Sequence, residues 1–139
     1  MKKNKFFATF LSILILSGLI LGTQAFAAST RKTIYLSDYQ IWNNQPGVTR
    51  TLNYSYVYSR LYSVYPVSGG TDTFTKAQVQ LQDLAGTGLT NIYTLDEAST
   101  SSTSMPIFEG KLATSSVKFV FRGNSPSYAA YADVSYDPK

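Results

Sequence analysis

In the stretch FTKAQVQLQDL, residues 74–84, apolar side chains and glutamines alternate from Ala77 to Gln82. A β-strand turns successive side chains to opposite sides, so this period of two predicts a strand with one face in a core and the other in water. The stretch SVKFVFR has the same period and places Val117, Phe119 and Phe121 on one face. These two segments predict a fold that is built from sheets.

Further stretches of period two occur at residues 33–42, 49–65, 89–95, 105–113 and 128–136, and turn sequences such as NNQPG (43–47), AGTG (85–88) and GNSPS (123–127) lie between them. We therefore predict an all-β protein, a single antiparallel β-sandwich of about 7–8 strands. The last two strands, joined by GNSPS, are expected to form a hairpin. The polar segment DEASTSSTS (96–104) is expected to be a mobile surface loop.

The first 27 residues have the layout of a secretory signal peptide. MKKNK carries three lysines, an apolar run follows from Phe6 to Gly22, and Ala25 and Ala27 have the spacing of a cleavage site. The apolar run is at the short limit for a membrane span, so cleavage after Ala27 is favoured over a retained anchor. Residues 28–139 would then form the sandwich domain. We expect a secreted, extracellular protein, and such a leader is typical of Gram-positive bacteria.

The charge of the chain gives little support to nucleic-acid binding. Three of the twelve basic residues lie in the leader, so the remaining chain holds nine basic and eight acidic residues, a net charge of +1. No cluster of lysines and arginines stands out, whereas nucleic-acid binding depends on such clusters. Membrane contact is expected only during export, and the oligomeric state stays open.

Histidine and cysteine are both absent. This excludes Ser-His-Asp triads, Cys-His dyads, zinc sites built on histidine, and stabilisation by disulfides. No nucleotide-binding fingerprint occurs either, and we expect neither a cofactor nor catalysis. One enzymatic alternative survives, a glycosidase that uses paired carboxylates. Its candidate residues are Asp96, Glu97, Glu109 and Asp133.

A calcium site would need several oxygen ligands close together. The candidates are Asp72, Asp96, Asp133 and Asp137, but they are scattered and none lies in an EF-hand-like loop. We therefore predict no metal site.

Tyrosine is the strongest functional signal, with 11 in the chain. In residues 52–65 one parity reads Leu52, Tyr54, Tyr56, Tyr58, Arg60, Tyr62 and Val64, and the other reads Asn53, Ser55, Val57, Ser59, Leu61, Ser63 and Tyr65. Burial of large apolar area favours Tyr54 and Tyr56 on the inner side. In an alternative arrangement, a β-bulge near Ser59 and Arg60 keeps the first tyrosines inside and turns the later ones outward.

Exposed aromatic side chains suit a binding surface, since each offers a flat apolar ring, and tyrosine adds a polar tip. The candidate binding residues are Trp42, Arg60, Tyr62 and Tyr65. We expect a non-catalytic binding module that acts on a cell-wall or other glycan, a cell surface or an extracellular protein partner. The alternatives are a small membrane-active or antibacterial factor, and a protein inhibitor or matrix protein.

Overall fold

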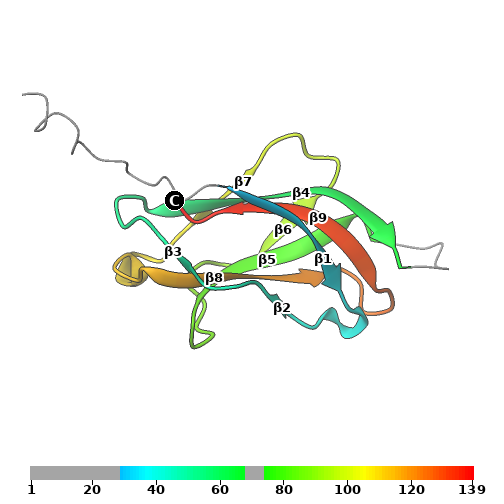
Figure 1. The fold of residues 1–139 in the computed structure, drawn as a ribbon, viewed down its shortest axis with the longest axis horizontal. Helices are drawn as coiled ribbons and strands as arrows, with labels where there is room; N and C mark the ends of the chain where they lie inside the picture. Colours follow the sequence, from blue (N-terminus) through cyan, green and yellow to red (C-terminus); the bar gives the residue numbers. More distant parts are fainter. Residues whose placement is uncertain (1–28, 68–73) are drawn as a thin grey trace, which may run out of the picture.

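The computed structural model describes residues 29–67 and 74–139, and it forms two antiparallel sheets packed face to face (Figure 1). The four-stranded sheet has the order β1 (Thr30–Leu36), β9 (Ala130–Asp137), β4 (Tyr56–Pro66) and β7 (Thr103–Pro106). The second sheet has the order β2 (Asn43–Asn44), β8 (Ser116–Gly123), β5 (Lys76–Asp83) and β6 (Tyr93–Asp96), and β3 (Val48–Thr49) also pairs with β8.

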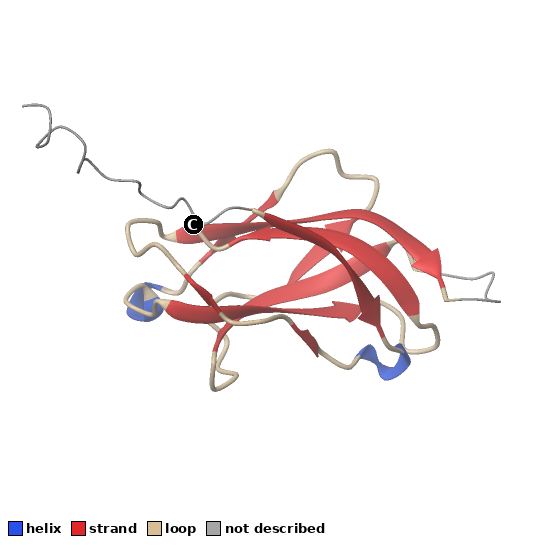
Figure 2. Ribbon diagram, viewed as in Figure 1, coloured by secondary structure: helices blue, strands red, loops and turns tan. Residues whose placement is uncertain are grey.

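Two short 3-10 turns, η1 (Asp38–Gln40) and η2 (Glu109–Lys111), lie at opposite ends of the two sheets (Figure 2). The predicted all-β sandwich is therefore confirmed. The predicted leader, residues 1–27, lies outside the described residues. Within the described ranges, no helix is long and apolar enough to cross a membrane.

The core lies between the two sheets and uses the strand faces that show the clearest alternation. The predicted inner residues of β5 and β8 are all buried: Ala77, Val79, Leu81, Val117, Phe119 and Phe121. From the other sheet, β9 contributes Tyr136, whose ring centroid lies 4.8 Å from that of Phe119. Aromatic contacts between the sheets add to the area burial that drives the packing.

The sequence analysis favoured Tyr54 and Tyr56 on the inner side of their strand, but the structure buries the opposite face of β4. Val57, Ser59 and Leu61 point into the core and are buried, whereas Tyr56 and Tyr58 point outward. The physical reason is polarity, because a buried tyrosine or arginine needs a hydrogen-bond partner for every polar group. The face with Val57, Ser59 and Leu61 has only one side-chain polar group to satisfy, and the Ser59 hydroxyl donates to the Ser135 carbonyl oxygen at 2.9 Å.

A β-bulge interrupts β4 at Tyr62, two residues beyond the position considered in the sequence. Leu61 is paired with Val134 and Ser63 with Asp133, so Tyr62 is an extra residue between them. The extra residue changes the parity of the strand. As a result Val64 packs against the core, and Tyr65 faces outward opposite Tyr131.

The prediction that the last two strands, β8 and β9, form a hairpin is wrong. β8 belongs to the five-stranded sheet and β9 to the four-stranded sheet, so GNSPS starts a connection that crosses from one layer to the other. Both strands carry a continuous apolar face, and such faces can be buried against each other across the core as well as side by side. The contact between Phe119 and Tyr136 shows the first arrangement.

A buried arginine that the sequence did not single out anchors the loop after β3. Arg50 is 2 % exposed, and its guanidinium donates hydrogen bonds to the carbonyl oxygens of Thr51, Tyr54, Leu112 and Thr114. Burial lowers the pKa of this guanidinium from its ordinary value. The carbonyl oxygens take the place of water around the charge and connect two segments that are far apart in sequence.

Candidate binding face

Seven of the tyrosines lie on the outer side of the four-stranded sheet. On β9 the buried apolar residues are Ala130, Ala132, Val134 and Tyr136, so the residues between them point away from the core, although Ser135 is also covered. Alternation turns Tyr35 on β1 and Tyr56 and Tyr58 on β4 outward, and the bulge at Tyr62 does the same for Tyr65. We call this surface the tyrosine face; its tyrosines are Tyr35, Tyr54, Tyr56, Tyr58, Tyr62, Tyr65 and Tyr131.

Three tyrosines form a row straight across this sheet. Tyr131 on β9 is paired with Tyr35 on β1 and with Tyr65 on β4. The ring centroid of Tyr131 lies 5.7 Å from that of Tyr35 and 6.1 Å from that of Tyr65. The three side chains are 40–45 % exposed, and the Tyr65 hydroxyl donates to the Thr33 hydroxyl at 3.3 Å. We call Tyr35, Tyr131 and Tyr65 the tyrosine row.

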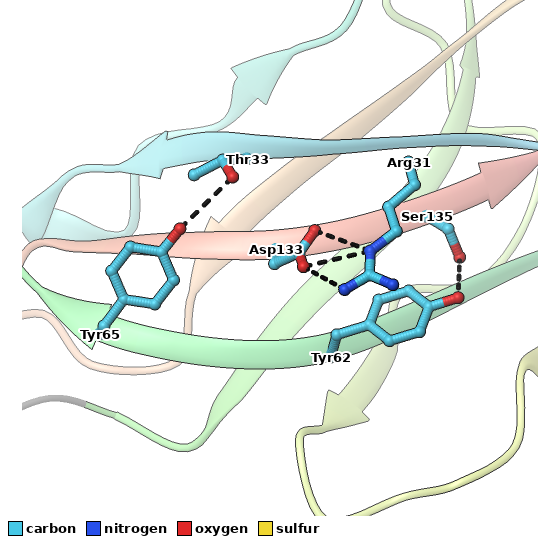
Figure 3. A network of polar contacts seen from close by, with 6 residues as sticks. All are labelled: Arg31, Thr33, Tyr62, Tyr65, Asp133 and Ser135. Atoms are coloured by element: carbon cyan, nitrogen blue, oxygen red, sulfur yellow. Dashed lines mark hydrogen bonds and ion pairs between the residues drawn. The ribbon is translucent and has the colours of Figure 1, made fainter.

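Beside this row, the guanidiniums of two arginines approach the ring of Tyr62 at the bulge, and Figure 3 shows one of them, Arg31. The guanidinium carbon lies 3.8 Å from the ring centroid of Tyr62 for Arg31 and 4.5 Å for Arg60. The Ser135 hydroxyl donates to the Tyr62 hydroxyl at 3.4 Å. Contacts between a guanidinium and a tyrosine ring are attractive, so they help to hold the bulged ring in place.

Only one of these two arginines has a carboxylate partner among the described residues. Arg31 donates to both carboxylate oxygens of Asp133, with nitrogen–oxygen distances from 2.5 to 3.2 Å. This hydrogen bonding raises the pKa of the Arg31 guanidinium above its ordinary value. Arg60 takes part in none of the ion pairs found in residues 29–67 and 74–139.

At the other end of the tyrosine face, Tyr54, Tyr56 and Tyr58 follow each other. Neighbouring ring centroids are 6.2 Å and 5.3 Å apart, in edge-to-face geometry. The ammonium nitrogen of Lys139 lies 5.3 Å from the Tyr58 centroid and 5.6 Å from that of Tyr54. Each of these contacts contributes little alone, but together they order the rings into a surface.

A pocket of about 460 Å³ opens at this end of the face. Its walls include Tyr58, Ser135, Asp137, Lys139, Ser29 and Ser102. The pocket thus combines one aromatic wall with hydroxyl groups, a carboxylate and an ammonium group. Its volume lies within the range of small-molecule sites, and its lining side chains all carry polar groups.

The structure brings together three of the four predicted binding residues. Arg60, Tyr62 and Tyr65 all lie on the tyrosine face, whereas Trp42 lies on the outside of the other sheet. There the Trp42 ring lies 4.3 Å from the guanidinium carbon of Arg122, which also donates to the Gln78 side chain at 2.7 Å.

The sequence analysis missed Arg31, Tyr35 and Tyr131 as members of the same surface. The sequence did contain a signal that Tyr35 and Tyr131 face outward, because each alternates with apolar residues that are buried in its own strand. What no local pattern contained was the pairing of β1 and β4 with β9, which places these residues side by side.

Four of the carboxylates proposed for catalysis or calcium binding have other partners. Asp96 pairs with Lys76 at 3.4 Å, Glu97 accepts from the Val64 amide at 2.9 Å, and Asp133 binds Arg31. Asp137 lies 4.0 Å from the Lys139 ammonium, and Glu109 is exposed in η2.

Asp72 lies outside the described residues. Within the described part of the chain, no group of three or more acidic side chains is gathered in a way that could hold a metal ion.

Comparison with family models, curated proteins and solved structures found no match to this chain. The functional argument therefore depends on the geometry of the tyrosine face.

Proposed function

We propose that this protein is an exported, non-catalytic module that binds glycan chains on its tyrosine face. The observation that carries the proposal is the tyrosine row, three partly exposed rings set side by side across three strands. A row of aromatic rings on a rigid sheet offers apolar planes for the C–H faces of successive sugars, and the phenol hydroxyls stay available to sugar hydroxyls.

The polar pocket supports the same class of ligand. A sugar hydroxyl both donates and accepts hydrogen bonds, and the pocket offers serine hydroxyls, an acceptor carboxylate at Asp137 and a donor ammonium at Lys139. Tyr58 forms part of its wall and also belongs to the tyrosine face. The tyrosine row crosses β4 at Tyr65 and the pocket adjoins β4 at Tyr58, so the pocket offers a second, polar contact region on the same face.

The chemistry of the face favours a sugar over a lipid or an apolar protein surface. Its large exposed side chains are tyrosines, and each ring carries a hydroxyl group. Of the exposed aliphatic residues, Ile41, Leu84 and Ile92 lie next to strands of the other sheet, and Leu52 lies in the segment before β4. Membrane-binding surfaces instead combine exposed apolar side chains with clustered basic residues.

The test is a pull-down with insoluble polysaccharides, comparing wild type with a Tyr35→Ala, Tyr65→Ala, Tyr131→Ala triple variant. If each ring contributes about 1 kcal/mol, the triple variant should bind roughly a hundredfold more weakly. Trp42→Ala is the matched control, because it removes an aromatic ring from the opposite sheet and should leave binding unchanged.

Circular dichroism spectra should show that both variants keep the β-sheet signal of wild type. Retention of full binding by the triple variant would refute the proposed face, and loss of binding in Trp42→Ala alone would move the site to the other sheet. If the protein binds lipid vesicles but no polysaccharide, a membrane function would replace the proposal.

A further inference from the structure

The two arginines beside Tyr62 occupy corresponding positions on the two strands that flank β9. They differ in whether a carboxylate neutralises their charge. Arg31 on β1 and Arg60 on β4 are both paired with Ser135 of β9, so they lie in one row across the sheet. Both contact the Tyr62 ring. The two arginines differ in burial and in the acid beside them: the Arg31 side chain is 57 % exposed and pairs with Asp133, whereas Arg60 is partly buried.

Asp133 neutralises one of the two positive charges. It accepts three hydrogen bonds from the Arg31 guanidinium, which uses both carboxylate oxygens. Such a paired fork is the strong geometry for an arginine and a carboxylate. Asp133 therefore balances the positive charge of Arg31.

Arg60 keeps its charge and an unused donor. Its Nε atom is buried and has no hydrogen-bond partner among the described residues, and the ion pairs found in that part of the chain do not include Arg60. A buried donor without a partner destabilises a protein by roughly 1–3 kcal/mol. A buried donor without a partner calls for an explanation, and an acceptor on a bound water, ion or ligand is one.

The residues around Arg60 narrow the chemical class of the group that could bind it. Tyr62 lies against the guanidinium, Tyr65 follows on the same strand, and Tyr58 and the polar pocket lie on the other side along β4. An anion bound here is therefore surrounded by rings and hydroxyl groups rather than by a field of positive charge. This environment suits a carboxylate carried on a sugar ring better than a phosphate-rich polymer, which needs several cations.

We propose that the ligand of the tyrosine face is a polysaccharide that carries carboxylate groups, and that Arg60 binds the carboxylate. This inference rests on the proposed function and adds the ligand class to it. The Arg60 guanidinium pairs with the carboxylate, and the rings of Tyr62 and Tyr65 contact the sugars. The carboxylate of the ligand would then balance the charge of Arg60, as Asp133 balances that of Arg31.

The test compares acidic polysaccharides with their neutral forms. The probes are polygalacturonate, hyaluronate and alginate, each beside the same polymer after chemical reduction of its carboxyl groups to alcohols, in affinity gel electrophoresis. Charge-assisted hydrogen bonds predict that wild type binds the acidic form of at least one pair about tenfold or more tightly. High salt should reduce this preference only in part, because the guanidinium is half-buried.

Arg60→Gln should remove the preference and leave binding of the reduced polymer unchanged. Arg122→Gln is the matched control, since Arg122 also lies over an aromatic ring but on the opposite sheet, and it should keep the preference. Asp133→Asn should increase the preference, because it frees the charge of Arg31.

Wild type that binds both forms of every pair equally would overturn the carboxylate inference and leave the glycan-binding function intact. A preference that survives Arg60→Gln would also overturn it. Absence of binding to all six polymers, together with absence of binding in the pull-down, would overturn both proposals.

Discussion

Replacing Arg50 with methionine is expected to lower the free energy of unfolding by about 2–3 kcal/mol. The Arg50 guanidinium donates to the carbonyl oxygens of Tyr54 at 2.6 Å, Thr114 at 3.2 Å and Thr51 at 3.3 Å, and also to that of Leu112. Methionine has a similar length but no donor. These oxygens would then lose their partner inside the protein.

The magnitude follows from two opposing contributions. Loss of the four hydrogen bonds destabilises the folded state by about 1 kcal/mol each, or about 4 kcal/mol in total. Removing a buried charge restores part of this, because the guanidinium no longer has to be taken out of water; we assign about 1–2 kcal/mol to that gain. The net loss is a large part of the stability of a domain of this size.

Urea denaturation followed by far-ultraviolet circular dichroism measures this loss. With a slope of about 1–2 kcal/mol per molar urea, the midpoint should fall by roughly 1–3 M. Arg122→Met is the control, because Arg122 makes one side-chain hydrogen bond and one ring contact on the surface. Its loss should stay below about 1 kcal/mol. An Arg50→Met variant within about 0.5 kcal/mol of wild type, or no less stable than Arg122→Met, would refute the reasoning.

Two further predictions test the faces of the sheet and the buried phenol. Leu61→Ala should destabilise by about 2–4 kcal/mol, since Leu61 is buried, whereas Tyr58→Ala on the outer side should cost about 1 kcal/mol or less; equal losses in urea would contradict the assignment of faces. Burial raises the pKa of the Tyr136 phenol, so stability should be intact below the ordinary value of about 10 and decline as pH rises through the folded-state pKa. Tyr136→Phe should show a smaller alkaline decline in urea titrations, and an identical decline would count against the buried phenol.

The parts of the fold that were predicted correctly are those where one strand face is uniformly apolar. β5 alternates alanine, valine and leucine with glutamine, so only one register buries its apolar side chains, and β8 behaves in the same way. β4 gave no such signal, because one of its faces is large and polar-tipped while the other is small. Its orientation depended on the space and polarity of a core that other strands fill.

The sequence predicted individual residues of the candidate site, but not which of them lie together on one surface. Arg60, Tyr62 and Tyr65 were recognised because tyrosine and arginine suit a binding surface, but nothing local linked them to Arg31 or Tyr131. Trp42 has the same chemical character and lies on the opposite sheet. Composition shows which side chains are able to bind a ligand, whereas strand order decides which of them share a surface.

The sequence by itself determined the class of the fold and the range of chemistry. Period-two alternation specified sheets, and the absence of histidine and cysteine excluded whole classes of catalytic and metal sites. Only the tertiary structure decided that the tyrosines face outward and that the bulge at Tyr62 aligns Tyr65 with Tyr131. The physical reason is that alternation specifies two faces of a strand, but the opposing sheet and the neighbouring strands decide which face is buried.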